Sequence, residues 1–541
     1  MFGNYPVNDD WIFVSQVEAF SQGIFTLNAE LDPSFIAQGF LGLLWGKIFG
    51  ISFVNLQILT FLITIIAVFV FIQILKEFNV KKPFIIFFSL LLFFNPIIFV
   101  SAFTFMTENY YLLFFLGSTY FYIMFLQNQN KILYLILGSI LVLVSILIRQ
   151  IGALIGFSLI LVLLFDIVKR GKLNRFSAIS IIMLLALVIF SLLITLLWPR
   201  FNENRKLILN EQLITRIKFI LLSLHYFPLF IFPVLAGLNI KILDNKFITV
   251  ILIPIFIFIL IYLYNFDIYP VGNVFYLEEL YSKSDFRSAF SLFDNILFKS
   301  LFVTLTAFCI TKFIVFFLER IRRYKSNLSI KNMNSVNQFL IILGVSNFII
   351  LLFSSDYYDR YLIPSFICLF ILIIRNFAAE IKINKLSIFC LIMAIFIVIF
   401  LQWEFSAKNR LMWDQARKLS EKTGYFSQIS LNDTYTNYII TKKENDFTGL
   451  IERKSFEKKC YVQDYSVESD SNLFMSILNL EDYIDVNILE KKKPYLVNKK
   501  EGFPKVKKHL DNLIYNQEYF SFLFNFVGKR AFVASWCNEN I

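Results

Sequence analysis

The 541-residue sequence contains few of the residues from which proteins build metal and redox sites. It has 2 His and 5 Cys, and no CxxC motif is present. His225 and His509 are far apart, so nothing indicates a zinc or iron–sulfur site. Three cysteines lie in apolar runs, where we expect inert core residues: Cys309, Cys368 and Cys390. Cys460 and Cys537 lie in a polar C-terminal tail and would pair if that tail faces an oxidising compartment.

Charged residues are also scarce, at 17% of the chain against 57% hydrophobic residues. A soluble domain is typically about 45–50% apolar and about 25% charged. Apolar runs of about 18 or more residues recur, which is long enough to cross about 30 Å of hydrocarbon as helices. The composition therefore predicts an integral, multi-pass membrane protein in contact with membrane lipid. The net charge of +12 is attributed to basic cytoplasmic loops, so no nucleic-acid partner is expected.

Twelve hydrophobic segments are predicted to be transmembrane helices, which gives an all-α polytopic fold. The apolar run 132–168 should form two helices that turn at Arg149 and Gln150, because a lone Arg at bilayer depth is costly. The Gly-interrupted stretch 33–50 would be a short spanning helix or, preferably, an interfacial helix. The predicted segments are 54–75, 83–101, 109–126, 132–148, 151–168, 176–197, 217–236, 247–265, 291–318, 337–353, 361–377 and 386–402.

Basic segments set the predicted orientation. Residues 76–82, 169–175 and 319–325 are rich in Lys and Arg and are separated by even numbers of crossings, so they should face the cytoplasm. Three regions follow: a first extracytoplasmic loop (1–53), a transmembrane domain (54–402) and a small extracytoplasmic α/β domain (403–541). Twelve crossings leave both ends of the chain outside. We therefore expect a further transmembrane helix upstream of residue 1.

With this orientation, the unusual polar residues fall on one side of the membrane. Each alone is ordinary at a helix end, but several acids and arginines on one outer face favour a polar cleft. They lie in the first loop or at the outer ends of predicted helices and are Asp9, Asp10, Glu108, Arg149, Gln150, Asp359, Arg360 and Tyr361.

Four short stretches, in this order, resemble membrane glycosyltransferases of the GT-C class. They are NDDW with the following VEAFSQG, then FMTENYYLLFFLGSTYFY, ILIRQIGALIG and YDRYLIP, and they span about residues 1–375. The sequence looks most similar to the glycosyltransferase family 39-like group, which includes dolichyl-phosphate-mannose–protein mannosyltransferases and aminoarabinose transferases. The resemblance implies inverting sugar transfer from a polyprenyl-phosphate donor to a lipid, glycan or protein hydroxyl. It also implies cell-envelope glycosylation at the outer face of the plasma membrane.

The resemblance further implies roles for individual residues. In the family an acid of the first outer loop is the catalytic carboxylate, and Asp9 and Asp10 match that position. A sugar hydroxyl is a poor nucleophile, so a positioned base contributes roughly 10²–10⁴-fold. Adjacent residues of an extended segment point to opposite faces, so one Asp would be the base and the other would fix the loop or a metal. Asp10 is slightly favoured as the base. Six residues would bind substrate: Glu108, Arg149, Gln150, Asp359, Arg360 and Tyr361.

The departing lipid phosphate carries charge that must be neutralised. Arginine does this bidentately, and a divalent metal ion held by carboxylates could share the task. The ligands of such a metal are left unknown, and no redox cofactor is needed because the donor carries its own activated bond.

Each assignment has a structural alternative. The two aspartates could lie in a solvated loop, and Glu108 could complement a helix dipole, with Thr107 as the cap. Arg149 could snorkel to the membrane interface. Arg360 could instead pair internally with Asp359 or Glu108, and Tyr361 and Trp11 could be interfacial anchors. The rival function is a lipid or glycan transporter or flippase, in which charges would gather near the bilayer midplane on broken helices.

Overall fold

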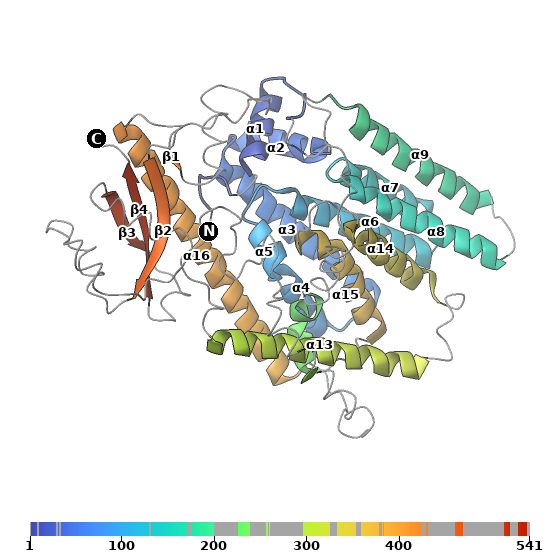
Figure 1. Cartoon of the computed structure of the whole chain (residues 1–541). Coiled ribbons are helices and arrows are strands. Elements are labelled where there is room, and N and C mark those ends of the chain that lie inside the picture. Colours follow the sequence, from blue (N-terminus) through green and yellow to red (C-terminus); the bar gives the residue numbers. More distant parts are fainter. Residues whose placement is uncertain are drawn as a thin grey trace.

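The structure is a computed structural model, and it is mostly helical (Figure 1). It describes residues 2–7, 10–28, 31, 34–128, 131–170, 175–199, 226–237, 256–257, 259, 296–324, 333–352, 359–377, 381, 383–423, 429–430, 460–468, 513–519 and 529–537. Everything below refers to these residues.

The N-terminal half contains the helices α1 (Asp10–Ser21), α2 (Ile36–Phe49), α3 (Phe53–Glu77), α4 (Lys82–Phe93), α5 (Pro96–Ser101), α6 (Thr107–Gln127), α7 (Ile132–Ile146), η1 (Gln150–Gly152), α8 (Ala153–Arg170) and α9 (Arg175–Leu197). The second half contains α11 (Phe232–Gly237), α13 (Ile296–Tyr324), α14 (Ser335–Leu352), η4 (Asp359–Leu362), α15 (Ile363–Phe377) and α16 (Lys385–Thr423). Four strands follow: β1 (Ile429–Ser430), β2 (Cys460–Glu468), β3 (Leu513–Tyr519) and β4 (Lys529–Cys537).

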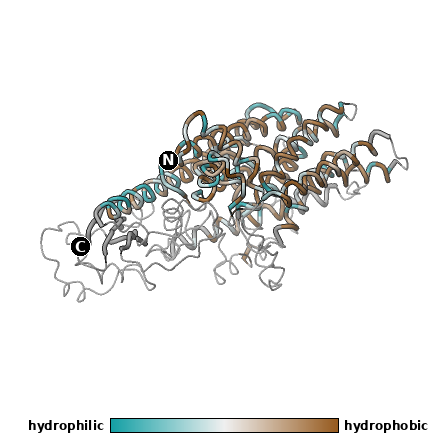
Figure 2. The backbone as a smooth tube through the Cα atoms, turned by 90° about the horizontal axis from the view of Figure 1, so that it is seen from above, coloured by the Kyte–Doolittle hydropathy of each residue, from teal (hydrophilic) through white to brown (hydrophobic). Residues whose placement is uncertain are grey.

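Among the described residues, 6 helices are long and apolar enough to cross a membrane. They cover Phe53–Glu77, Thr107–Gln127, Gln150–Lys169, Ala178–Leu197, Arg360–Phe377 and Lys385–Glu421. Hydrophobic residues run through this bundle, and hydrophilic ones mark the end of α16 that approaches the C-terminus (Figure 2). The helices support a membrane protein, whereas the predicted number of twelve crossings stays a prediction. Of the predicted segments, residues 217–225 and most of 247–265 lie outside the described residues.

Two predicted helices differ from the structure for local reasons. The segment 83–101 is broken into α4 and α5 at Asn95 and Pro96. Proline cannot donate in a helix interior but suits a first turn, and the Asn95 side chain accepts a hydrogen bond from the Ile97 N–H at 3.1 Å. The last predicted segment continues far past residue 402, because α16 is one helix of 39 residues. The proposed boundary between the membrane domain and the tail therefore falls inside a helix.

One end of the bundle gathers the helix ends that flank the predicted cytoplasmic loops. Arg375, in the last turn of α15, lies over the ring of Phe78 just after α3, with the guanidinium carbon 4.9 Å from the ring centroid. Arg375 also donates to Asn334 at 3.2 Å. Next to Asn334, Ser335 begins α14 and lies 3.4 Å from a carboxylate oxygen of Asp166 near the end of α8. These contacts bring together the end of α3, the end of α8, the start of α14 and the end of α15.

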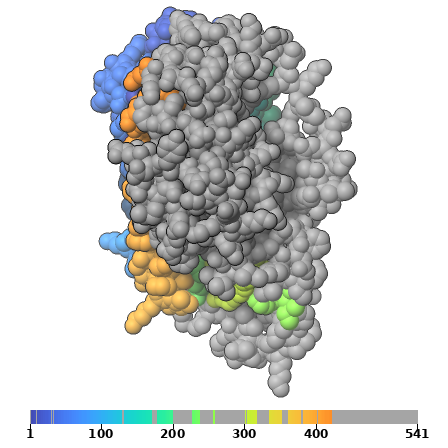
Figure 3. All heavy atoms as spheres, turned by 60° about the vertical axis from the view of Figure 1, so that its left-hand side comes forward, coloured from blue at the N-terminus to red at the C-terminus, as the bar shows by residue number. Residues whose placement is uncertain are grey.

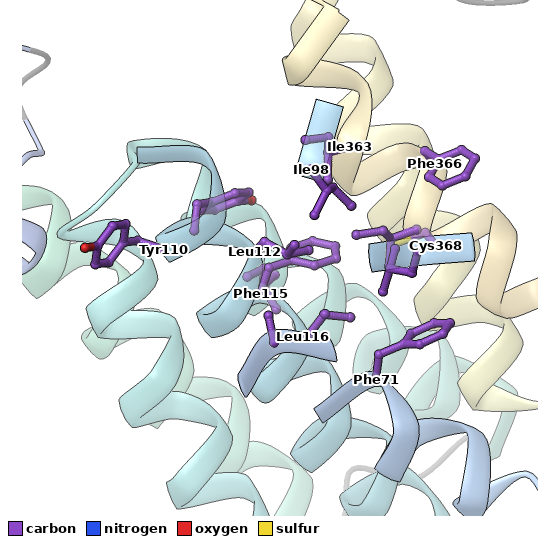
Figure 4. Close-up of a cluster of buried hydrophobic side chains, with 14 of the residues drawn as sticks. Phe71, Ile98, Tyr110, Leu112, Phe115, Leu116, Ile363, Phe366 and Cys368 are labelled. Carbon is purple, nitrogen blue, oxygen red and sulfur yellow. The ribbon is translucent and has the colours of Figure 1, made fainter. Parts of the chain in front are cut away.

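The centre of the bundle is aromatic and aliphatic, and it joins the helices that carry the candidate site. Phe71 of α3 stacks on Phe370 of α15, with ring centroids 5.9 Å apart. Leu112, Phe115 and Leu116 of α6 pack in the same cluster (Figure 4). This dry core fixes α3, α6 and α15 relative to one another. The three cysteines predicted to be inert core residues are free thiols buried in α13, α15 and α16.

The C-terminal strands form a four-stranded sheet with the order β1-β2-β4-β3. The β1 and β2 strands are parallel, and the pairs β2–β4 and β3–β4 are antiparallel. The sheet lies against α16 (Figure 1). The described part of the tail consists of the end of α16 and this mixed sheet. That residues 403–541 form a separate domain stays a prediction.

The segment before α1 is fastened to α16. The Tyr5 hydroxyl donates to the carbonyl of Ser406 at 2.9 Å, Arg410 donates to the carbonyl of Phe2 at 2.9 Å, and Arg417 donates to that of Asn4 at 2.6 Å. Burial raises the pKa of Tyr5 to about 12, so this hydroxyl keeps its proton. In Figure 3 the N-terminal residues and α16 meet at the molecular surface.

Candidate functional site

The site begins at a tight turn between α7 and α8. Arg149 follows the end of α7, and Gly152 donates its N–H to the Arg149 carbonyl at 2.9 Å. A side chain at position 152 would lie 2.8 Å from the Ser145 carbonyl carbon and 2.9 Å from the Ile146 nitrogen. The turn therefore needs glycine, and it presents Arg149 at the helix ends as predicted. Gln150 begins η1 and is half-buried.

Glu108 is the centre of a buried ion triad with Arg149 and Arg360. Its Oε1 lies 2.8 Å from Nη2 of Arg149 and 3.1 Å from Nε of Arg360. The exposed fractions of the side chains are 1% for Glu108, 11% for Arg149 and 7% for Arg360. One carboxylate thus faces two guanidinium groups in a nearly dry environment.

The three members of the triad come from positions far apart in sequence. Glu108 is in the first turn of α6, and Arg360 is in η4, directly before α15. Thr107 is not the cap of α6, contrary to the prediction, because the N-cap is Met106. The Thr107 hydroxyl instead accepts a hydrogen bond from Nε of Arg149 at 2.8 Å. The predicted internal pair of Arg360 is present with Glu108.

Tyr361 lies beside both guanidinium groups. Its ring centroid is 4.8 Å from the guanidinium carbon of Arg149 and 5.8 Å from that of Arg360. Such placement over an aromatic ring holds a guanidinium in position. Arg360 also lies 3.4 Å from the Met106 sulfur. Tyr361 therefore packs within the triad and not as an isolated interfacial anchor. Trp11 also differs from that prediction, because it is buried in the core with 5% of its surface exposed.

Asp10 occupies the first position of α1 and is fully buried. Its N–H donates to the Val7 carbonyl at 3.2 Å, and its carboxylate complements the positive end of the helix. The predicted extended conformation is therefore wrong at Asp10, as is the alternative of a solvated loop. Asp10 interacts electrostatically with Tyr110, two residues after Glu108 in α6. Asp9 lies outside the described residues.

The short helix α2 packs over the same end of the bundle. The N–H groups of Ile36 and Ala37 donate to the Leu147 carbonyl at the end of α7, at 3.0 and 3.1 Å. Gln38 donates to the carbonyl of Phe105, just before α6, at 3.0 Å. α2 has 14 residues and exposes large apolar side chains, and its interfacial position stays a prediction.

The structure thus joins Glu108, Arg149, Arg360 and Tyr361 at one end of the bundle. Asp359 begins η4, and its backbone alone is described. Sequence reasoning missed the roles of Met106 and Thr107 as partners of the arginines. Both immediately precede Glu108, and a polar hydroxyl beside a buried acid was the available signal.

Within the described residues, no group of three or more His, Cys, Asp or Glu side chains could hold a metal ion. The described carboxylates of the site, Asp10 and Glu108, are engaged with a helix start and with two arginines respectively. These described residues do not by themselves fit a divalent ion.

Comparison of the chain with known proteins adds no relative to this picture: no family model matches it, and no curated protein does.

Proposed function

We propose that the chain is a membrane glycosyltransferase that moves a sugar from a polyprenyl-phosphate donor to a hydroxyl group. The main support is the ion triad, which places two guanidinium groups together at the ends of apolar helices. The charge of a lipid phosphate lies where the hydrocarbon layer ends, which is also where the ends of membrane-spanning helices lie. The likeness of the four sequence stretches to GT-C enzymes supports the same conclusion.

In the proposed reaction Asp10 is the general base. It takes the proton of the acceptor hydroxyl, the oxygen attacks the anomeric carbon from the face opposite the phosphate, and the anomeric carbon–oxygen bond of the donor breaks. The products are an inverted glycoside and a polyprenyl phosphate. Because Asp10 is fully buried, an acceptor can reach it only when neighbouring residues move. Catalytic hydrogen bonds commonly form in the substrate complex and are absent before it.

Arg149 and Arg360 would hold the departing phosphate. Both are already oriented by Glu108 and Tyr361, so little side-chain entropy is lost when the phosphate binds. Glu108 has a further feature that suits a sugar. Its Oε2 is buried and accepts no hydrogen bond from the residues that the structure describes. A sugar hydroxyl would satisfy that oxygen.

The positions of these charges favour an enzyme over a transporter. Glu108 is in the first turn of α6, Arg360 directly precedes α15, and Arg149 lies in the turn before α8. All three are at helix ends, whereas a transport pathway places such groups near the middle of the bilayer.

The test uses membranes containing the full chain and a panel of polyprenyl-phosphate sugars, with release of polyprenyl phosphate as the readout. One donor should be turned over, and Asp10→Asn should abolish release while expression is retained. Glu18→Gln, two turns further along α1, is the matched control and should keep the rate. Full activity of an Asp9→Asn/Asp10→Asn double variant would refute the assignment of the base.

Donor binding is read from the dependence of the rate on donor concentration. Arg360→Ala should raise the concentration needed for half-maximal rate, because a phosphate contact is lost. An unchanged donor dependence would assign Arg360 to the internal ion pair alone. Failure of every donor in the panel would instead favour a lipid or glycan transporter.

A further inference from the structure

The pairing of β2 with β4 places two cysteines directly opposite each other. Cys460 is the first residue of β2, and Cys537 is the last residue of β4. The two strands are antiparallel, and Cys460 is the register partner of Cys537. Residues directly opposite in an antiparallel pair share a face of the sheet. Their Cα atoms lie about 4.5 or 5.5 Å apart, depending on the type of pair.

We propose that Cys460 and Cys537 form a cross-strand disulfide that closes the end of the sheet. Disulfides join residues whose Cα atoms are about 4.4–6.8 Å apart, a range that contains both spacings. The other cysteines, Cys309, Cys368 and Cys390, are buried free thiols in apolar helices. Cys460 and Cys537 are therefore left as partners for each other.

Formation of the disulfide requires an oxidant in the compartment that the tail faces. Two S–H bonds break, one S–S bond forms, and two protons and two electrons leave the cysteines. A disulfide-bonded oxidoreductase accepts the electrons and becomes a dithiol. Such oxidants act outside the cytoplasm, so the bond would form if the tail is extracytoplasmic. This inference does not depend on glycosyl transfer.

The bond would fasten the two central strands of the sheet at one end. β1 pairs with β2 at this same end, where Ile429 is the partner of Cys460. The covalent link would also enclose β3 and the chain between β2 and β4. Closing so long a loop restricts the unfolded tail strongly.

The test counts free thiols on the full chain. The protein is taken from its own membrane, denatured, and then labelled at its free thiols with a polyethylene-glycol maleimide. Of the 5 cysteines, 3 should react before reduction and all 5 after it. Cys460→Ser and Cys537→Ser are matched single variants, and each should show 4 reactive thiols with or without reductant. Mass spectrometry of the unreduced protein should detect a linked peptide pair containing Cys460 and Cys537.

Five reactive thiols before reduction would overturn the proposal, as would linkage of either residue to a different cysteine. The serine variants are not required to fold for this conclusion, because the count and the linked peptides come from the unaltered chain. Sugar transfer is not measured, so failure of the disulfide and failure of the proposed enzyme activity are distinguished.

Discussion

Removing the charge of Glu108 should destabilise the protein, because two buried guanidinium groups would lose their shared counter-ion. The carboxylate is 1% exposed, and Oε1 lies 2.8 Å from Arg149 and 3.1 Å from Arg360. Breaking a buried ion pair by removing one partner costs about 3–5 kcal/mol. Glu108→Gln keeps a neutral acceptor for one arginine, so we expect the lower end of that range. At roughly 2 °C for each kcal/mol, the apparent Tm should fall by about 6 °C or more.

The assay heats detergent-solubilised protein and measures the fraction that remains monodisperse by fluorescence-detected size exclusion. All variants are heated at one rate, because membrane proteins commonly unfold irreversibly. Asp414→Asn is the matched control, since Asp414 pairs with Arg417 at 3.8 Å while both side chains are 49% exposed. An exposed pair contributes about 0–1 kcal/mol, so this control should shift the apparent Tm by about 2 °C at most.

A second variant separates lost charge balance from lost packing. Glu108→Leu/Arg149→Met/Arg360→Met replaces the whole triad with apolar side chains, a change that is often neutral or stabilising in other buried triads. The apparent Tm of this triple variant should lie close to that of the unaltered protein and above that of Glu108→Gln. The variant should not transfer sugar. An unchanged Tm in Glu108→Gln would refute the buried-charge reasoning. A triple variant as unstable as Glu108→Gln would assign the loss to packing.

Two further changes test how the site is held. Gly152→Ala should destabilise the protein by about 1–3 kcal/mol through overpacking, because the new Cβ would meet backbone atoms of Ser145 and Ile146 within 3 Å. The apparent Tm and the transfer rate should both fall. An apparent Tm equal to that of the unaltered protein would contradict the tight turn. Arg417→Ala removes the 2.6 Å contact with the Asn4 carbonyl and should lower transfer several-fold with a shift in apparent Tm of about 2 °C or less. An unchanged rate would show that the contact does not position the chain before α1.

Helix position was predictable from apolar runs, and helix ends were predictable where a local signal existed. The turn at Arg149 follows from the cost of a charge within the bilayer, and the structure has α7 end just before it. Pro96 was an equally visible signal for the break before α5, but the apolar run continues across it, so hydropathy predicted a single helix. The continuation of α16 also had a signal. Residues 403–423 contain no Gly or Pro, although their charge suggested a change of domain.

The residue types of the site were predictable, but their partners were not. Position at an outer helix end follows from topology, so Glu108, Arg149 and Arg360 could be placed on one face. Their pairing depends on how α6, α8 and α15 pack, and no local pattern encodes contacts over such sequence separations. Asp10 shows the opposite error. An extended segment was predicted at Asp10, whereas Asp10 and the apolar residues that follow it form a buried helix.

The long helix α16 links the tail to the site, so the side of the membrane on which one lies determines the side of the other. At 1.5 Å per residue its 39 residues extend about 58 Å, roughly twice the hydrocarbon thickness, so a large part lies beyond the membrane. Ser406, Arg410 and Arg417, which hold the N-terminal segment, lie on this extension at helical spacings that share one face. The sheet lies against the same helix, and Asp10 follows the held segment by a few residues. We therefore predict that the tail and Asp10 lie on the same side of the membrane. A disulfide between Cys460 and Cys537 would consequently assign the buried carboxylate to that side as well.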